Sequence, residues 1–572
     1  MSTFTGVGVS PGRIIGPVQQ MPRPVAEPSA GEKWSNTTVD DETARLKTAA
    51  KKVQAELQRR ADSATGDAKA ILEATAMMAA DPMLLKSANA LIVAGTSAER
   101  AVWEAGAQVA DMLRGLGGYM AERTQDVLDV RSRVVAELRG LPAPGIPTAD
   151  HPFVLAAEDL APADTATLNP ELVIALITSS GGPQSHTAIL ARALGLPAVV
   201  AARGVEDIDD GTEVFVDGAA GTVLTGPGDA ERTAAAIWTE QARSLGTYSG
   251  TCTTTDGHRV PLLANVGSGA DARKAAEAGA EGVGLLRTEF CFLDRETEPT
   301  VAEQSVAYRQ VFDAFPAGKV VVRTLDAGAD KPLPFLTDAS EPNPALGVRG
   351  YRTELSTPGV LDRQLKAISE AADGATTDIW VMAPMISTAQ EAQHFAESCA
   401  AAGLKVPGVM VEVPSAALTA GAILQRVDFA SIGTNDLTQY VMAADRQLGP
   451  LAALNDPWQP AVLQLIRHTV AGAEAARGSE SSSKELNSDN GKSVGVCGEA
   501  AADPALAVVL VGLGVTSLSM SSRALAAVAA VIGSVSLTEA QGLAQQALAA
   551  PTALEARAAV RAGLPILGTL GL

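Results

Sequence analysis

Short apolar runs alternate with helix-length segments over the second half of the chain. Eight such runs begin near positions 261, 282, 320, 379, 408, 429, 494 and 514, among them GVGLLRTE and GVMVEVP. Eight apolar strands that alternate with helices over about 300 residues predict a closed (β/α)8 barrel. Active sites of that fold lie at the carboxyl ends of the strands, so the residues there are the first candidates for chemistry.

Helical periodicity dominates an earlier block, residues 31–144, whose first helix, DDETARLKTAAKKVQAELQRRA, places acids before bases as the helix dipole favours. Strand-like runs flank the block, GVGVSPGRIIGPV before it and FVLAAEDL, LVIALITSS, AVVAA and EVFVDGAAGTVLTG after it. The predicted fold class is therefore α/β and multidomain. A small α/β domain of residues 1–30 and 145–226 would contain the helical domain as an insertion, followed by a linker helix, 227–250, and the barrel, 251–572.

Composition narrows the classes of function. The 572 residues are 47% hydrophobic, 19% charged and only 3% aromatic, which predicts a folded chain with an aliphatic core. A formal net charge of −21 argues against nucleic-acid partners, because phosphate backbones attract basic surfaces. The sequence has neither a leader-like start nor an apolar run of membrane-spanning length, so we expect a cytoplasmic protein without membrane insertion.

The four cysteines lack CxxC spacing and predict reduced thiols rather than a disulfide or zinc framework. We interpret Cys252, Cys291 and Cys399 as buried packing residues. Cys497 differs, because in GVCGEAA it closes the seventh predicted strand. A thiol that is protonated at neutral pH can donate a proton to an enolate there, although a packing role is the alternative.

Acidic residues and arginines lie at the ends of different predicted strands. Glu412 in MVEVPSA and Asp436 in GTNDLTQY offer carboxylates from neighbouring strands, a donor set that suits Mg2+. Pairing of these acids with arginines is the alternative, and both interpretations can hold together. Guanidinium groups bind carboxylate and phosphate bidentately, so a cluster of arginines indicates a small substrate that carries both groups. The arginines that can converge on this mouth are Arg287, Arg323, Arg349 and Arg446.

One histidine stands at a predicted helix start. His186 follows GGPQS and opens HTAILARALG, with Ser185 as the expected N-cap and Gly195 as the expected stop. Backbone N–H groups at a helix N-terminus stabilise an attached anion such as phosphate. A core histidine satisfied by a carbonyl group is the alternative, which spacing alone leaves open.

Ten segments in order resemble enzyme I of the phosphoenolpyruvate-dependent sugar phosphotransferase system, over nearly the whole chain. They are SPG, DLAPADTATL, GGPQSHTAILAR, GLLRTEFCFLDR, VVRTLDAGADKPLP, NPALGVR, PMIST, GVMVEVPSA, SIGTNDLTQYVMAADR and GVCGEAA. The resemblance implies a phosphohistidine swivelling α/β domain with an inserted all-helical domain, followed by a (β/α)8 TIM barrel.

The resemblance also implies roles for single residues. His186 would be phosphorylated on Nε2, with Thr165 as a nearby hydroxyl group, and Cys497 would protonate the departing enolate. Glu412 and Asp436 would bind Mg2+. Phosphoenolpyruvate would be bound by Arg287, Arg323, Asn435, Asp436, Arg446 and Arg349.

Partners follow from the same resemblance. The phosphoryl group would pass from His186 to the phosphocarrier protein HPr, which would dock on the helical domain around Ile71–Leu85. The methionines there, Met77, Met78 and Met83, are core residues in the alternative interpretation. The small domain would swing about Gly226–Gly228 and the linker helix, and the barrel would form a homodimer.

Two other classes of protein compete with this prediction. A pyruvate phosphate dikinase or phosphoenolpyruvate synthase shares the histidine domain and barrel, but carries a large ATP-binding domain before them. Here only 185 residues precede His186, and the sequence has no GxxxxGK loop for nucleotide phosphates. A non-catalytic phosphoenolpyruvate sensor would have no need of Cys497 as a proton donor. The polar stretch 478–492 is expected to be a flexible surface insertion without function.

Overall fold

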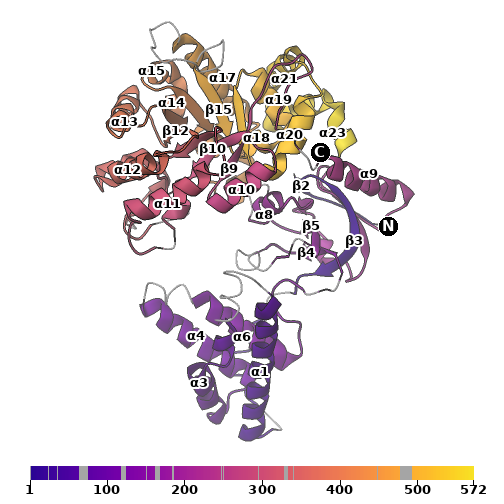
Figure 1. Ribbon diagram of the computed structural model, residues 1–572. Helices are drawn as coiled ribbons and strands as arrows, with labels where there is room; N and C mark the ends of the chain where they lie inside the picture. Colours follow the sequence, from indigo (N-terminus) through magenta and orange to yellow (C-terminus); the bar gives the residue numbers. More distant parts are fainter. Residues whose placement is uncertain are drawn as a thin grey trace. The chain divides into compact units, whose positions relative to one another are not determined.

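The chain divides into two compact units in the computed structural model, with a boundary between Arg232 and Thr233 (Figure 1). The first unit is made almost entirely from residues before this boundary and the second from residues after it. The structure describes residues 2–572 except 23–24, 35–36, 64–74, 117–123, 148, 150, 161–167, 170, 183–185, 246–247, 249, 294, 328–332, 339, 447–448 and 477–491. Ser185, Thr165 and nearly all of the 478–492 insertion therefore lie outside the described residues.

An eight-stranded sheet organises the first unit, in the order β1-β8-β7-β3-β4-β5-β6-β2. Its strands are β1 (Thr3–Thr5), β2 (Val7–Ser10), β3 (Arg13–Gln20), β4 (Phe153–Ala157), β5 (Val173–Thr178), β6 (Ala198–Val200), β7 (Glu213–Asp217) and β8 (Thr222–Thr225). Strands β3 to β6 run parallel, and alternate residues of β4 enter two different cores. Phe153 and Leu155 pack with Ala188 and Ala191 of helix α8 (His186–Leu194), so α8 covers one face of the sheet.

Helices α1 (Val39–Ser63), α3 (Pro82–Val93), α4 (Ala98–Leu116) and α6 (Thr124–Arg139) stand in sequence between β3 and β4. These two strands nevertheless pair directly, with Val18 opposite Val154. The helical block is thus an insertion between neighbouring strands, which confirms the prediction. It has its own aliphatic core, which includes Leu46, Leu57 and Ile92.

The methionines of the helical block do not share one environment. The side chains of Met77 and Met83 are 68% and 50% exposed, so the interpretation of these two as core residues is wrong. Met78 packs against the helical core. Helix α3 begins after Asp81, whose side chain accepts hydrogen bonds from the backbone N–H groups of Met83 and Leu84, and this cap fixes the turn that exposes Met83.

Eight parallel strands close into a barrel in the second unit, as the alternating pattern predicted. They are β9 (Leu262–Val266), β10 (Gly282–Arg287), β11 (Lys319–Arg323), β12 (Asp378–Ala383), β13 (Pro407–Val411), β14 (Phe429–Gly433), β15 (Ser493–Cys497) and β16 (Ser517–Met520). The barrel interior is filled by a separate apolar cluster that includes Leu285, Val321, Trp380, Met382 and Cys497. The interior is therefore a packed core, and space for chemistry remains only at the strand ends.

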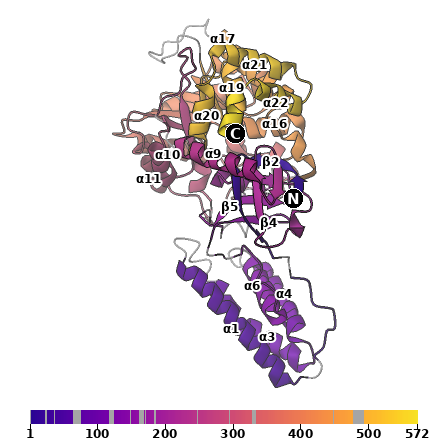
Figure 2. The same cartoon turned by 90° about the vertical axis from the view of Figure 1, so that its right-hand side faces the viewer.

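Helices surround the barrel strands (Figures 1 and 2). They are α10 (Gly269–Glu277), α11 (Val301–Phe312), α12 (Val360–Ala372), α13 (Ala389–Ala401), α14 (Pro414–Leu418), α15 (Ala420–Leu424), α16 (Thr434–Met442), α17 (Pro460–Ala475), α18 (Glu499–Ala502), α19 (Pro504–Gly512), α20 (Leu525–Ile532), α21 (Leu537–Ala549), α22 (Ala553–Ala562) and α23 (Pro565–Leu570). Capping boxes start three of them, at Thr300, Thr388 and Ser536. Helix α9 (Asp229–Leu245) contains the boundary between the two units.

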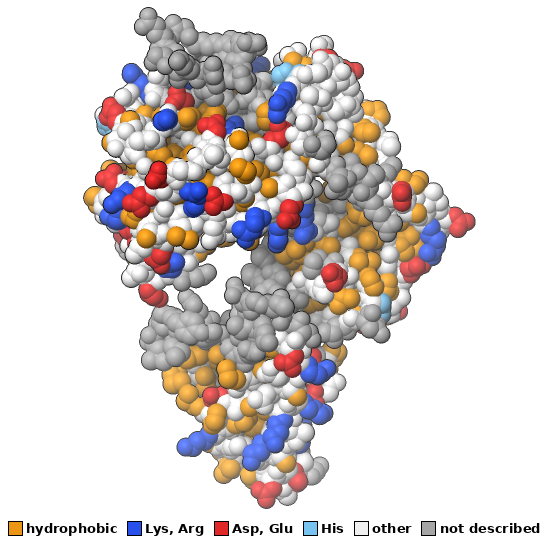
Figure 3. All heavy atoms as spheres, in the orientation of Figure 1, with side chains coloured by type: hydrophobic (Ala, Val, Ile, Leu, Met, Phe, Trp, Pro, Cys, Tyr) orange, Lys and Arg blue, Asp and Glu red, His pale blue; other side chains and the backbone are white. Residues whose placement is uncertain are grey.

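Acidic and basic side chains are interspersed on the visible face of the barrel (Figure 3). Among the described residues, no single helix is both long and apolar enough to cross a membrane, although the bent pair Ser522–Ile532 and Leu537–Ala549 reaches that composition jointly. All four cysteines are free thiols. Cys252 and Cys399 are buried as expected, whereas Cys291 is only partly buried, although it packs against the apolar cluster around Phe292.

Candidate active site at the barrel mouth

The strand ends of the barrel place most of the predicted site residues at one mouth. Arg287, Arg323 and Cys497 are the last residues of β10, β11 and β15, and Glu412 follows β13 directly. Asn435 and Asp436 lie in the first turn of α16, which continues from β14. All these strands run parallel around a closed barrel, so their carboxyl ends meet at the same side.

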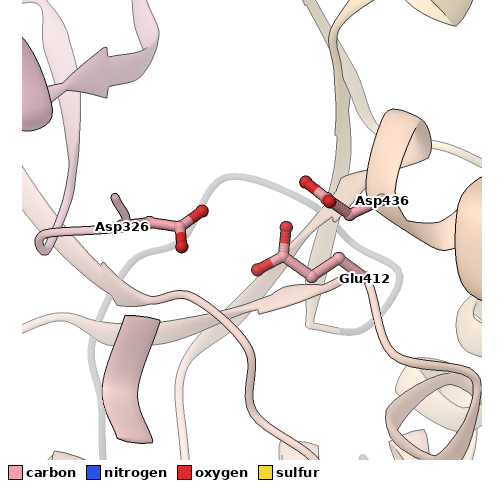
Figure 4. A group of neighbouring side chains, drawn as sticks. All are labelled: Asp326, Glu412 and Asp436. Carbon is pink, nitrogen blue, oxygen red and sulfur yellow. The ribbon is translucent and has the colours of Figure 1, made fainter. Parts of the chain in front are cut away.

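Three carboxylates converge at this mouth. Asp326, Glu412 and Asp436 are buried, and each offers an oxygen atom within 4.8 Å of the others. Figure 4 shows the three side chains pointing toward one another, Asp436 from the start of a helix and the other two from loops. Asp326 was not among the residues predicted from the sequence. It follows the end of β11 by three residues, in VVVRTLD, and that position was its sequence signal.

The carboxyl group of Glu412 belongs to the most deeply buried of these three residues. It is 1% exposed and accepts a hydrogen bond of 2.6 Å from the backbone N–H of Met385. Burial, and then the charges of Asp326 and Asp436, raise the pKa of Glu412 to about 8, against the opposing effect of the nearby arginines. Gly433 leaves room for this carboxyl group, because a Cβ there would lie 2.9 Å from its oxygen.

Two buried arginines bind the carboxylates. Arg323 forms ion pairs of 3.0 Å with Glu289 and 3.2 Å with Asp326. Arg349 forms ion pairs of 2.8 Å with Asp326 and 3.0 Å with Asp436. Burial alone would lower the pKa of both arginines, but the surrounding carboxylates outweigh it and raise the pKa above the ordinary value. Both guanidinium groups are therefore fixed cations in a water-poor site.

The other predicted binding residues lie at the edge of this network. Nη1 of Arg446 is 3.9 Å from a carboxylate oxygen of Asp436. Asn435 is exposed at the start of α16. Arg287 lines a cavity of about 360 Å³ together with Phe290 and Tyr308. The mouth thus combines buried, paired charges with more accessible polar groups around them.

The thiol of Cys497 lies at the inner limit of the site. Its Sγ donates to the carbonyl oxygen of Ile432 at 3.5 Å, and its side chain belongs to the apolar interior of the barrel. Burial raises the pKa of this thiol, although Ser431 and Arg323 act in the opposite direction. The group is thus protonated at neutral pH and close to the charged residues, and it also packs in the core, so the two interpretations of this cysteine are compatible.

His186 belongs to the other unit, where it is the first residue of α8. The next residue, Thr187, is buried, and its hydroxyl donates to the Asp159 carboxylate at 2.6 Å. The backbone N–H of Leu160 donates to both of these side chains. The helix ends before Gly195, whose φ of 67° stops it as expected. The start of α8 is thus fastened to the loop after β4, and the sequence did not predict this Asp159–Thr187 bond.

Comparison with known proteins identifies the family of the chain that carries this site. Profiles of the PEP-utilising enzymes match the chain in three parts, the N-terminal domain at residues 5–123, the mobile domain at 149–221 and the PEP-binding domain at 242–537. The phosphoenolpyruvate-protein phosphotransferase of Streptomyces coelicolor is 51% identical over 566 residues, which cover 98% of this chain and 99% of that protein. The chain belongs to the phosphoenolpyruvate-protein phosphotransferase family.

Further relatives carry the same name or a related one. The phosphoenolpyruvate-protein phosphotransferase of Haloferax volcanii is 38% identical over 573 residues, 97% of this chain and 98% of that protein. A solution structure of an Enzyme I protein is 31% identical, covers 41% of this chain and 99% of its own, and has a TM-score of 0.35. Family membership makes the chain an enzyme that uses phosphoenolpyruvate, which excludes a non-catalytic sensor. The end-to-end match also favours a protein phosphotransferase over a dikinase.

Proposed function

We propose that the chain transfers the phosphoryl group of phosphoenolpyruvate to its own His186 and then to a histidine of the phosphocarrier protein HPr, as the first step of sugar uptake. Pyruvate is the second product. The observation that supports this most is the barrel mouth, where buried arginines and carboxylates from different strands meet. A small substrate with carboxylate and phosphate groups needs such a preorganised charged site.

The polar groups around the mouth bind the substrate in this proposal. Arg323 is held by Glu289 and Asp326, so its guanidinium needs little reorganisation when charge develops on the substrate. A loose phosphoryl-transfer transition state spreads negative charge over several oxygens, and several cations are required to match it. The residues that we assign to phosphoenolpyruvate are Arg287, Arg323, Asn435, Asp436, Arg446 and Arg349.

We assign Mg2+ to Glu412 and Asp436, with Asp326 as a third carboxylate of the same cluster. Buried carboxylate oxygens are hard donors, and they fit this ion better than a softer metal. Bound Mg2+ would neutralise charge on the phosphate oxygens. Arg349 forms ion pairs with two of these acids, so it competes with the ion for their oxygen atoms.

The reaction moves one phosphoryl group and one proton. Neutral His186 attacks phosphorus through Nε2, the bond between phosphorus and the enol oxygen breaks, and its electron pair stays on the enolate. Cys497 then gives its thiol proton to C3 of the enolate, which becomes pyruvate, and the thiolate regains a proton from solvent. The raised pKa of Cys497 keeps this proton available at neutral pH.

The remaining assignments concern domains and partners. The swivelling domain would comprise residues 1–30 and 145–226, the helical domain 31–144, the linker helix 227–250 and the barrel 251–572. HPr would dock on the helical domain near the exposed Met77 and Met83. The swivelling domain would swing about Gly226–Gly228 to bring His186 to both of its reaction partners.

We also propose a homodimer through the barrel and a cytoplasmic location. Leu346 and Leu355, which are 68% and 80% exposed in the segment after β11, support an association surface on the barrel. The net charge of −21 and the intermixed surface charges favour protein partners over nucleic acids.

Transfer of label from radioactive phosphoenolpyruvate tests the proposal. Wild type with Mg2+ should acquire acid-labile, base-stable label that moves to added HPr. His186→Ala should acquire none, whereas His151→Ala, which changes an exposed histidine of the same unit, should label normally. An unlabelled wild type, or equal labelling of His186→Ala, would show that the phosphoryl acceptor has been assigned wrongly.

A further inference from the structure

The guanidinium group of Arg349 fills the space between two aspartates of the barrel mouth. Its Nε and Nη2 atoms donate to the Asp326 carboxylate at 3.1 and 2.8 Å. Its Nη1 atom donates to Asp436 at 3.0 Å, and Nη2 is 3.4 Å from the second oxygen of that group. Arg349 is 4% exposed, so all three nitrogens are satisfied by buried partners rather than by water.

The same two aspartates belong to the carboxylate cluster. With Glu412 they form the group of oxygens within 4.8 Å of one another that suits a divalent cation. A guanidinium and a metal ion would use the same oxygen lone pairs, and the two cations repel each other strongly where water is excluded. The cluster therefore cannot give its full set of donors to a metal while Arg349 bridges both aspartates.

We propose that Arg349 is a resident counter-cation of the metal site, and that a divalent cation binds only when Arg349 withdraws from Asp436. This inference rests on the metal assignment in the proposed function. The arginine does not have to leave the mouth. It can keep a contact with Asp326 while Nη1 turns away from Asp436 toward Tyr440, whose hydroxyl lies 3.3 Å from Nη1.

The backbone around Arg349 restricts this exchange to the side chain. Gly350 has a φ of 59°, and a Cβ there would lie 2.9 Å from the Met385 side chain, so the turn after Arg349 is closely packed. Tyr440 also donates to the carbonyl oxygen of Ala345, which fastens the preceding loop. The exchange therefore consists of a rotation of the guanidinium between Asp436 and another anion.

An anionic substrate supplies that other anion. Phosphate oxygens accept the same paired N–H groups as a carboxylate, so a bound substrate phosphate compensates Arg349 for the loss of Asp436. Metal and substrate should thus increase each other's affinity, and by linkage the two increases are equal. Arg349 is accordingly a positioning residue for the metal as well as a substrate ligand.

Binding of Mn2+ to the full chain, measured by electron paramagnetic resonance without phosphoenolpyruvate, tests the inference. Arg349→Met removes the guanidinium and should lower the Kd for Mn2+ by at least about tenfold, since Asp436 loses the charge-assisted contact that competes with the metal. The matched control is Arg352→Met. It removes the same charge from the same turn, but that guanidinium donates to the Ser387 hydroxyl at 2.8 Å, and the Kd should stay within about twofold.

A second variant separates bridging from simple charge repulsion. Arg349→Lys keeps the positive charge but loses the planar fork that reaches both aspartates, so it should also bind Mn2+ more tightly than wild type. A Kd for Arg349→Lys equal to that of wild type would overturn the bridging mechanism. A Kd for Arg349→Met that is unchanged or higher would overturn the whole inference.

The failure of this inference differs from failure of the proposed metal site. Glu412→Gln should weaken Mn2+ binding in either background, because it removes the carboxylate that Arg349 does not contact. If wild type binds Mn2+ through Glu412 but Arg349→Met binds it no more tightly, the metal site stands and the competition is wrong. If neither wild type nor Arg349→Met binds Mn2+, the metal assignment itself is wrong, and this inference fails with it.

Discussion

The barrel mouth and the start of α8 hold their chemical groups in different ways. At the mouth, two buried arginines bind three acids, Glu289, Asp326 and Asp436, through ion pairs of 2.8–3.2 Å. At α8, the residue after His186 is fastened by one hydroxyl group to one carboxylate. The first arrangement fixes several charges at once, whereas the second fixes the direction of a helix end.

This difference matches what each region is proposed to do. A site that stabilises developing charge is most effective when its dipoles and ions are already in place. A histidine that must reach two reaction partners has to be accessible at the start of its helix. Charged groups around it would have to be removed from water each time a partner docked, and that costs free energy. The two regions should therefore respond differently to the loss of one polar group.

The largest effect is expected for Arg323→Met. It leaves Glu289 without its buried ion-pair partner and Asp326 with Arg349 alone, which should lower the free energy of unfolding by about 3 kcal/mol or more, and kcat by at least about 100-fold. Urea unfolding and initial rates of pyruvate formation measure the two quantities. The control is Arg363→Met, because Arg363 forms an exposed ion pair with Glu298 at 2.7 Å, and its loss should cost no more than about 1 kcal/mol. Equal destabilisation by both changes would refute the idea that burial makes the mouth special.

The barrel and the strand-end residues could be predicted because both depend on local pattern. Each strand is a short apolar run, and parallel strands in a closed barrel bring their ends together whatever the details of packing. Glu412, Asp436 and Cys497 follow directly from that geometry. Metal-compatible acids and a nearby thiol at strand ends are visible in the one-dimensional pattern.

The partners of the arginines could not be predicted, because they depend on the closed barrel. Glu289 follows Arg287 by two residues, yet it pairs with Arg323 on the neighbouring strand. The partners of Arg349 stand 23 and 87 residues away, one in the loop after β11 and the other in the first turn of α16. Pairing across such separations is decided by which strands become neighbours and by which side chains face inward, and neither is contained in the spacing of charges.

A smaller effect is expected for Thr187→Val at the start of α8. The change removes the hydroxyl that donates to Asp159 and should lower the free energy of unfolding of the first unit by about 1–2 kcal/mol. Labelling of His186 should slow by less than it does for Arg323→Met. Thr48→Val is the control, since that hydroxyl only donates to a backbone carbonyl on an exposed helix face, and it should change stability by no more than about 0.5 kcal/mol. A loss at Thr187 as large as that at Arg323 would remove the contrast between the two regions.

The smallest effect is expected for the pH dependence of the stability that Cys497 contributes. Its measurement shows whether the apolar interior of the barrel or the charged mouth beside it determines the pKa of this thiol. Burial raises the pKa of this thiol above its ordinary value of 9.0. The folded chain then retains a proton that the unfolded chain loses, so the stability contributed by Cys497 is present below about pH 9 and falls as pH rises further. The difference in unfolding free energy between wild type and Cys497→Ala should therefore stay constant from about pH 7 to about pH 9 and then decline. A rise that begins near pH 7 would mean that the charges of the mouth, above all Arg323, lower the pKa of this thiol below its ordinary value, because the unfolded chain would then hold the proton longer than the folded one. The thiol would in that case be a poor proton donor at neutral pH.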